Sequence, residues 1–242
     1  MTSLTPTRPQ TAKSERKTTL KIAYNPKYTI AEHGFDTTRK AQWIADELQN
    51  GAVPNSALVD PRSFVDRAKE LISEIHSEEY VQALKTGSPS ILATSQGFSW
   101  DKGIWGMAVN STAGVIAATE LALQEGAAGS LSSGLHHARR DSGAGFCTVN
   151  GLTATATHAK TLVDGRIVIL DFDAHCGGGT HSLIKDDEQI IHLDLSTNGF
   201  DSYEPVGENR LIIGNYSDDS YLEEVDEMLN RIPSDTGLLI YN

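Results

Sequence analysis

The stretch RIVILDFDAHCGGGTH, residues 166–181, begins as a continuous apolar run and ends abruptly in acidic, histidine and glycine residues. Two later stretches, QIIHLDLS at 189–196 and GLLIYN at 237–242, repeat the apolar run. Helical patterns at 150–163 and 221–232 accompany them, and this alternation is typical of a parallel sheet covered on both faces. Ligands bind such sheets beyond the carboxyl ends of the strands, which is where this chain places its polar residues. We therefore expect an α/β fold with three layers, α/β/α, around a mainly parallel sheet.

The N-terminal half is mainly helical by pattern. Its predicted elements are a half-buried strand at 20–25, helices at 37–49 and 110–124, and helical segments within 62–87 that end near Gly87. The last helix is rich in alanine and apolar on nearly all sides, so we expect it to be buried. Residues 1–18 are polar and basic, which predicts a flexible tail. Residues 19–242 would then form one domain, because the chain is too short for two large ones.

Composition excludes several classes of function. The formal net charge of −12 argues against binding nucleic acid through its phosphates, although it could attract a cationic substrate. No run approaches the roughly 18 apolar residues of a membrane span, and the N-terminus lacks a secretory apolar core. Two cysteines, Cys147 and Cys176, suit a reducing compartment. We expect a cytoplasmic protein, and the sequence leaves its oligomeric state open.

A metal site is predicted where the first apolar run ends. Asp171, Asp173 and His175 alternate, so on an extended strand they share one face, with alternate residues about 7 Å apart. The glycines that follow allow a sharp turn and close backbone approach. Gly177 stands where a binuclear site would carry another carboxylate, so one ion is expected, zinc or iron(II), with a third ligand from elsewhere. A strand that merely ends in a polar turn is the alternative.

The adjacent pair His136 and His137 is interpreted as a proton-transfer group beside that metal. Water bound to a metal has a pKa of about 7, and a base within hydrogen-bond reach completes its activation. Asp171 could orient one of the imidazoles. A chance pair on a surface loop is the alternative.

A thiol hydrolase that uses Cys147 or Cys176 is a competing hypothesis, although a cysteine in an apolar segment is more often a small buried side chain. The remaining histidines are interpreted most simply as surface or helix residues, and they are His33, His76, His158, His181 and His192.

The stretches SSGLHHARRDSGAGFCTVNG, residues 132–151, and ILDFDAHCGGGTH, residues 169–181, closely resemble the two central motifs of the histone deacetylase superfamily, which includes acetylpolyamine amidohydrolases. YNPKY, HGFDTTRKAQWI and IHSEEYVQAL resemble its N-terminal segments, nearest to class IV. The resemblance covers about residues 20–242. It implies the arginase/deacetylase type of fold and a zinc-dependent deacetylase domain at residues 19–242.

The resemblance also implies a role for each matching residue. His136 and His137 match the tandem catalytic histidines, with His137 as the principal general base and acid, and Asp171 matches the carboxylate behind His136. Asp173 and His175 match two zinc ligands. Gly145 and Phe146 match a carbonyl that receives the substrate amide and a wall of the acyl-lysine channel. A structural potassium ion is possible, held by the backbone carbonyls of Asp171, Asp173, His175 and Leu195.

Two departures from the family pattern affect the expected activity. Gly178 stands where the family usually has Asp or Asn to orient the second histidine, so His137 would need another partner. The family carries its third zinc ligand and a catalytic tyrosine beyond the strand that matches 237–242, so we interpret this chain as an N-terminal and central portion with weak activity or none. The expected reaction is hydrolysis of acetyl-lysine or an acetylated polyamine by metal-bound water. The alternative is an inactive domain that binds acyl-lysine or acts as a scaffold.

Overall fold

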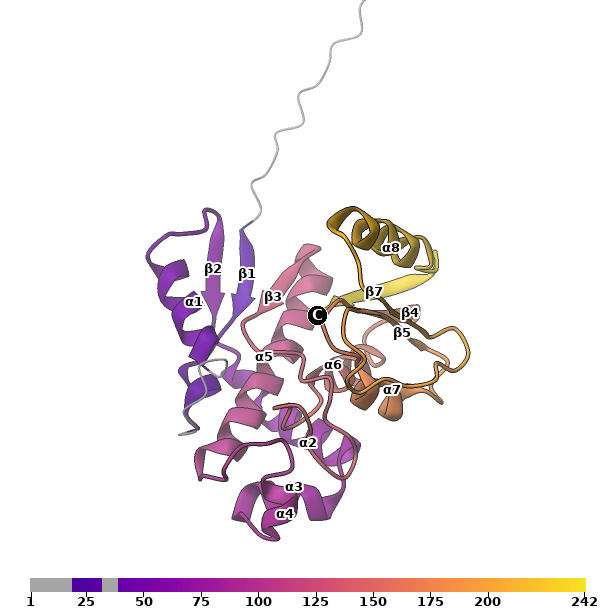
Figure 1. The fold of residues 1–242 in the computed structure, drawn as a ribbon. Helices are drawn as coiled ribbons and strands as arrows, with labels where there is room; N and C mark the ends of the chain where they lie inside the picture. The colour runs from indigo at the N-terminus through magenta and orange to yellow at the C-terminus, as the bar shows by residue number, and fades with distance from the viewer. Residues whose placement is uncertain (1–18, 32–38) are drawn as a thin grey trace, which may run out of the picture.

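The computed structural model describes residues 19–31 and 39–242. The predicted flexible tail at 1–18, the start of the helix predicted at 37–49, and His33 lie outside these residues. In the described part the chain builds two parallel sheets, with helices around them (Figure 1). The prediction of an α/β fold with a mainly parallel sheet is therefore confirmed.

The N-terminal sheet is small and has the strand order β2-β1-β3. Its strands are β1 (Leu20–Ala23), β2 (Ser56–Val59) and β3 (Ala128–Ser130), and both pairings are parallel. The sequence predicts β1 but neither of its neighbours, because runs of three or four residues carry too little period-2 pattern to be recognised.

The C-terminal sheet has the order β6-β5-β4-β7, again with every pairing parallel. Its strands are β4 (Arg166–Asp171), β5 (Ile190–Ser196), β6 (Arg210–Ile213) and β7 (Thr236–Tyr241). β4 and β5 lie in the centre and are almost wholly buried, which explains their continuous apolar sequences. Asp171 and Asp194 stand side by side in register near the carboxyl ends of these two strands.

Helices cover both faces of the C-terminal sheet (Figure 1). On one face, α6 (Gly151–Ala159) and α7 (Gly178–Ile184) pack Leu152 and Ile184 against Ile167 and Ile169. On the other, α8 (Asp218–Asn230) packs Met228 against strand residues such as Val168. Because burying one such side chain contributes about 1.5–3 kcal/mol, these two apolar layers hold the carboxyl edge of the sheet in place. This half of the molecule has the expected three layers.

The helical part of the chain packs around the long helix α5 (Gly103–Glu125), which is largely buried as predicted. The helical segments predicted within 62–87 are η3 (Arg62–Phe64), α2 (Val65–Ile75) and α3 (Glu78–Thr86). The break between α2 and α3 comes at His76, which is extended, and Ser77, whose side chain accepts from the amide of Tyr80 and begins α3. The other short elements are η1 (Pro26–Thr29), α1 (Lys40–Gln49) and α4 (Ser90–Ala93).

Beyond the carboxyl ends of β4 and β5, the chain continues to pair without forming regular strands. The amide of Thr197 donates to Ala174 O at 3.1 Å, and the amide of Cys176 donates to Phe200 O at 3.0 Å. His175 and Asn198 form an isolated parallel bridge. Residues 174–176 are thereby fixed against residues 197–200. Among the described residues, no helix combines the length and apolar character that a membrane crossing requires.

Candidate active site

The two adjacent histidines lie in the long loop between β3 and α6, and both are buried, with 5% and 4% of their surfaces exposed. Asn150 fixes the backbone of this loop, because its side-chain amide donates to His136 O at 3.3 Å and to Ala138 O at 3.0 Å. The amide of Thr180 donates to His136 O at 2.8 Å. Leu135, just before the pair, has a φ of 58°, which is unusual for a leucine and common at functional sites. The histidines are therefore held rigidly.

Asp171 is the partner of the first histidine, as predicted. His136 Nδ1 donates to Asp171 Oδ2 at 2.7 Å, and the carboxylate is fully buried. Burial opposes charge on both groups, but their mutual hydrogen bond and attraction outweigh it. The pKa of Asp171 is held below its usual range, with His192 assisting, and the pKa of His136 is raised. The second oxygen, Oδ1, accepts from Asn242 Nδ2 at 2.8 Å.

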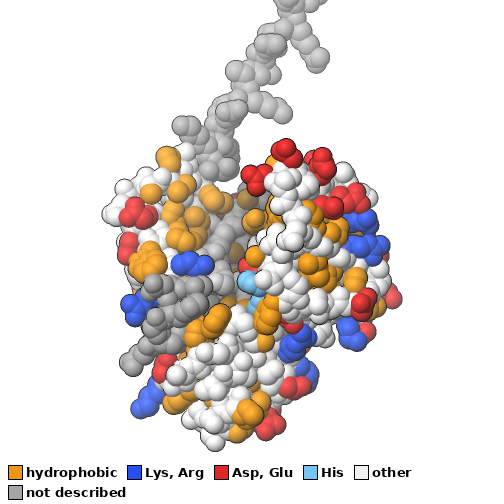
Figure 2. All heavy atoms as spheres, viewed as in Figure 1, with side chains coloured by type: hydrophobic (Ala, Val, Ile, Leu, Met, Phe, Trp, Pro, Cys, Tyr) orange, Lys and Arg blue, Asp and Glu red, His pale blue; other side chains and the backbone are white. Residues whose placement is uncertain are grey.

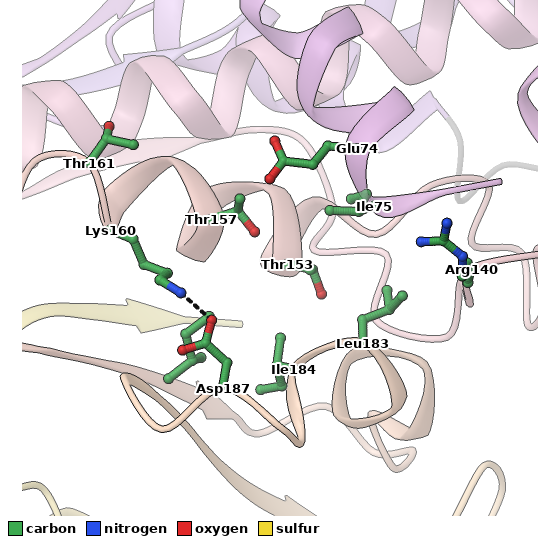
Figure 3. Close-up of a pocket in the computed structure, with 11 residues that line it drawn as sticks. Glu74, Ile75, Arg140, Thr153, Thr157, Lys160, Thr161, Leu183, Ile184 and Asp187 are labelled. Carbon is green, nitrogen blue, oxygen red and sulfur yellow. Dashed lines mark hydrogen bonds and ion pairs between the residues drawn. The ribbon is translucent and has the colours of Figure 1, made fainter. Parts of the chain in front are cut away.

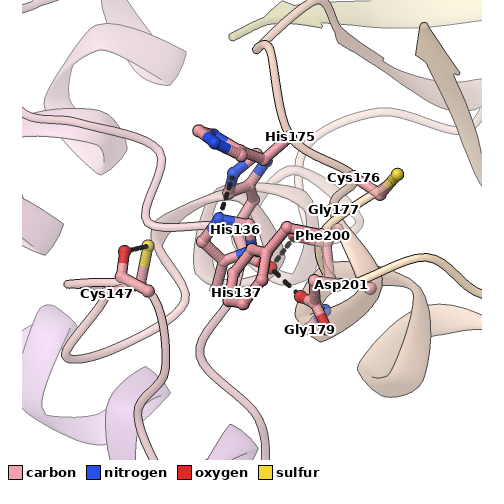
Figure 4. A network of polar contacts seen from close by, with 12 residues as sticks. His136, His137, Cys147, His175, Cys176, Gly177, Gly179, Phe200 and Asp201 are labelled. Atoms are coloured by element: carbon pink, nitrogen blue, oxygen red, sulfur yellow. Dashed lines mark hydrogen bonds and ion pairs between the residues drawn. The ribbon is translucent and has the colours of Figure 1, made fainter. Parts of the chain in front are cut away.

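The second histidine pairs with Asp201. His137 Nδ1 lies 2.9 Å from Asp201 Oδ2, and the same oxygen accepts from the amide of Gly179 at 3.1 Å (Figure 4). Arg139 donates to Asp201 Oδ1. The sequence leaves the partner of His137 open after Gly178, and it does not find Asp201, which lies 64 residues further along the chain.

The Nε2 atoms of the two imidazoles face each other. His136 Nε2 and His137 Nε2 are 3.1 Å apart, and the ring centroids are 4.0 Å apart. A carboxylate can only accept, so each Nδ1 that faces an aspartate carries a proton. Two neutral rings would then place two acceptors in contact. One further proton between the Nε2 atoms removes this repulsion, so the pair is built to hold and transfer a proton.

Asp173 and His175 lie together next to the His136–His137 pair. His175 Nδ1 is 3.2 Å from Asp173 Oδ1, and Asp173 Oδ1 is 3.5 Å from His136 Nε2. Two donors on a tetrahedral zinc ion, each about 2.0–2.1 Å from it, are about 3.4 Å apart. The observed separation and the mixed nitrogen/oxygen chemistry therefore fit zinc. Both side chains are 44% exposed.

The expected extension of the first strand as far as His175 is wrong. β4 ends at Asp171, and the chain bends at residues 173 and 174. Asp171 consequently does not share an exposed face with Asp173 and His175. It turns into the core toward His136, while the other two remain at the surface of the site.

The site opens into a cavity of about 600 Å³, whose lining includes the histidine pair, Asp173, His175 and both predicted substrate-binding residues. Gly145 has a φ of 50°, and a Cβ there would come within 2.4 Å of the His137 ring. Phe146 stands 5.2 Å, centroid to centroid, from Phe98 at the mouth. Histidine side chains are visible near the middle of this face in Figure 2. All the site residues predicted from the sequence except Asp171, which is buried behind His136, thus line one cavity.

Phe200 is a further aromatic neighbour of the site histidines that sequence reasoning missed. Its ring stands edge-on to His137 at 5.0 Å and to His175 at 5.9 Å, and half of it is exposed (Figure 4). It belongs to the segment that pairs with residues 174–176, and no spacing in the sequence connects it with the histidines.

A second group able to hold a metal lies deeper in the molecule. Asp171, His192 and Asp194 are all buried, and one ligand atom from each lies within 4.8 Å of the others. The expectation that His192 is a surface or helix residue is wrong, because β5 is buried on both faces. The carboxylates are already engaged: Asp194 Oδ2 accepts from the amide of Gly177 at 2.7 Å, and Oδ1 accepts from Ser196 Oγ at 2.7 Å. A potassium ion on the predicted backbone carbonyls stays a prediction.

Both cysteines are buried, which disfavours thiol chemistry. Burial raises the pKa of Cys147 to about 12, and it also raises the pKa of Cys176. The reactive thiolate would therefore be scarce at neutral pH.

A family model described as "Histone deacetylase domain" matches residues 33–215. Histone deacetylase 2 of Arabidopsis thaliana is 24% identical over 242 residues, covering 91% of this chain and 62% of the plant protein. A probable deacetylase of Archaeoglobus fulgidus is 30% identical, covering 71% and 50%, and the Bacillus subtilis acetoin utilization protein AcuC is 26% identical, covering 73% and 49%. The chain thus spans from 49% to 62% of the length of these relatives.

The crystal structure of the HDA15 HD domain superposes with a TM-score of 0.60 at 16% identity, covering 75% of this chain and 54% of that one. At this identity the likeness concerns the fold, and it agrees with the parallel α/β architecture described above.

Proposed function

The chain belongs to the histone deacetylase family, and from that premise we propose that it hydrolyses the N-acetyl group of acetyl-lysine or an acetylated polyamine with zinc as its cofactor. One observation carries the proposal: Asp173, which contacts His175, lies 3.5 Å from His136 Nε2, and the Nδ1 atoms of His136 and His137 each face a carboxylate that is at most 8% exposed. A metal and a proton-transfer group would thus act on the same atoms. Iron(II) is the alternative metal, because it accepts the same ligands in similar geometry.

The metal, when bound, would polarise the acetyl carbonyl and lower the pKa of a water molecule to about 7. His137 lies at the wall of the cavity, where its Nε2 can accept a proton from water and later return it to the leaving amine. His136 also lines the cavity, with its Nε2 3.1 Å from His137 Nε2, and Asp171 stabilises positive charge on it. The products would be acetate and a free amine.

The substrate proposed is a slender acetylated amine, because aromatic rings line the cavity and contact the site histidines. Phe146 and Phe98 lie on one side, and Phe200 stands over the histidines. Alkyl stems of lysine and of polyamines can pack against such rings while the acetyl group reaches the polar floor. The formal net charge of −12 would favour the approach of cationic substrates. The cytoplasm stays our proposal for its location.

The test is hydrolysis of an acetyl-lysine peptide and of an acetylated diamine by the zinc-loaded chain. Turnover should disappear with a chelator and return with zinc. His137→Ala should lower kcat by about 10²- to 10⁴-fold, with zinc binding unchanged. His158→Gln is the matched control, because this buried histidine pairs with Glu120 on α5, outside the site; its kcat should stay near the wild-type value.

Turnover that is indifferent to chelation or to His137→Ala would contradict the proposal. Tight binding of the acetylated peptide with no turnover would instead make this chain an acyl-lysine-binding domain. This is the alternative function, and it is favoured by the exposure of the two metal ligands proposed in this chain, Asp173 and His175. If neither binding nor turnover occurs, both functions are excluded.

A further inference from the structure

We propose that Asp201 is the positioning residue for His137, and that its carboxylate occupies the place that a side chain at position 178 would otherwise take. The inference rests on the proposed function, because it concerns how His137 is prepared to accept a proton. It also makes a claim about the metal-free chain, which can be tested separately.

The carboxylate of Asp201 is held by three different groups. His137 Nδ1 lies 2.9 Å from Oδ2, the amide of Gly179 donates to the same oxygen at 3.1 Å, and Arg139 donates to Oδ1. Arg139 also donates to Gly178 O at 3.1 Å. The side chain of Asp201 is only 8% exposed. A buried carboxylate needs hydrogen-bond partners, and these three groups fix its position.

The backbone around Asp201 is equally well defined. The preceding segment is fastened to residues 174–176 by the amide of Cys176 on Phe200 O and by the bridge between His175 and Asn198. Asp201 itself has a φ of 60°, a left-handed conformation that aspartate tolerates better than most residues. This turn directs its side chain back toward His137, as Figure 4 shows.

Gly178 makes room for this arrangement. A Cβ at position 178 would come within 2.2 Å of Asp201 O and 2.7 Å of Asp201 Oδ1. Real Cβ atoms do not approach other heavy atoms so closely, so any side chain at 178 would displace the segment that carries Asp201. The position of the Asp201 carboxylate therefore depends on the absence of a side chain at residue 178.

Asp201 determines which nitrogen of His137 carries the proton. A carboxylate accepts but does not donate, so its contact keeps the proton of the neutral ring on Nδ1. Nε2, which lines the cavity side and faces His136, is then free to accept a proton. Without Asp201, the ring could adopt the other tautomer or rotate, and Nε2 would no longer be reserved for the reaction.

The direct test is NMR of ¹⁵N-labelled histidine in the metal-free chain, at a pH where His137 is neutral. The wild type should show His137 protonated on Nδ1. Asp201→Ala should lose this preference, while Asp201→Asn should keep most of it, because the amide oxygen can still accept. An unchanged tautomer in folded Asp201→Ala would overturn the proposal.

A pair of glycine substitutions tests the steric part. Gly178→Ala should displace Asp201 and change the tautomer of His137 as Asp201→Ala does. Gly199→Ala, in the same segment as Asp201, is the matched control, because a Cβ there meets nothing within 4 Å; it should leave the spectrum unchanged. The steric coupling is wrong if Gly178→Ala leaves the His137 signals as they are.

Kinetics of the zinc-loaded chain give a second readout. Asp201→Ala should lower kcat about 10- to 100-fold, the usual loss when an orienting partner of a functional imidazole is removed, with KM within about twofold. Asp187→Ala is the control, because this aspartate pairs with Lys160 at a separate pocket (Figure 3). If the tautomer changes but no hydrolysis occurs in any variant, Asp201 keeps its role and the proposed function fails. If hydrolysis occurs but the tautomer of His137 does not change in Asp201→Ala, the proposed function stands and the role of Asp201 is wrong.

Discussion

The two halves of the candidate active site differ in how completely this chain builds them. The histidine pair is buried, and each outer nitrogen contacts a buried carboxylate: Asp171 behind His136 and Asp201 behind His137. Asp173 and His175, in contrast, are 44% exposed and contact mainly each other. The histidine pair with its carboxylates, which we call the proton-transfer half, is fixed by the folded chain. Asp173 and His175, which we call the ligand half, are open toward the cavity.

This difference teaches which properties depend on a metal. The proton-transfer half is held by hydrogen bonds that exist in the metal-free chain, so its geometry should survive removal of the ion. The ligand half has two donors at a suitable separation, but their exposed side chains gain a fixed geometry only when a cation joins them. Changes in the two halves should therefore have separable effects.

The largest effect is expected from the ligand half. His175→Ala or Asp173→Ala should weaken zinc binding by more than about 100-fold, because losing a direct ligand costs more than losing a partner behind it. Hydrolysis should fall with it. Equilibrium dialysis against zinc measures the loss. In His175→Ala, which keeps the Asp173 carboxylate beside His136, the NMR signals of His136 should change little. The separation of the two halves is contradicted if these variants bind zinc like the wild type, or if they also disorder the histidine pair.

A smaller effect concerns His76, which supports the buried half. Its Nδ1 donates to Arg139 O at 2.7 Å, and its Nε2 accepts from the amide of Asn150 at 3.1 Å. Burial lowers the pKa of His76 to about 4, although backbone carbonyls of Arg139 and Arg140 oppose this shift. A proton on Nε2 would face the Asn150 amide, so the folded state resists protonation.

The sign of the pH dependence follows from this lowered pKa. Between about pH 6.5 and 4 the unfolded chain binds the proton and the folded chain does not. The free energy of unfolding should therefore fall as the pH drops through this window, by about 3 kcal/mol in total for this one group. Urea unfolding at several pH values measures it. His76→Gln should be less stable at pH 7 but show a flatter profile; an equally steep profile would assign the dependence to other groups.

The smallest effect is expected at the cysteines. The double variant Cys147→Ser, Cys176→Ser should keep its kcat within about threefold, because thiols with raised pKa values supply little thiolate. Peptide hydrolysis measures this directly. A loss comparable to that of His137→Ala would replace the metal mechanism with thiol catalysis.

The sequence predicts those parts of the fold and site that short-range patterns encode. β4, β5 and β7 are long apolar runs, and Asp173 with His175 or His136 with His137 lie within three residues of each other. The short strands β2 and β3 leave too weak a pattern. They are established by pairing with β1, which is a tertiary effect.

Long-range features of the site escape sequence reasoning for the same reason. Asp201 meets His137 because residues 197–200 pair with 174–176, and no spacing reports this. The glycine at 178 was the available signal, since it predicts that His137 takes its partner from elsewhere. His192 shows a different error: the apolar run at 189–196 already indicates a strand covered on both faces, and the interpretation of His192 as a surface or helix residue left that run out of account.

The most direct test of the central claim is the position of a metal in crystals of this chain prepared with zinc, with data collected at the zinc absorption edge. The account predicts an anomalous peak about 2.0–2.2 Å from both His175 Nδ1 and the Asp173 carboxylate, above an undisturbed histidine pair. A peak among Asp171, His192 and Asp194 with none at Asp173 and His175, or no peak at either group, would contradict it.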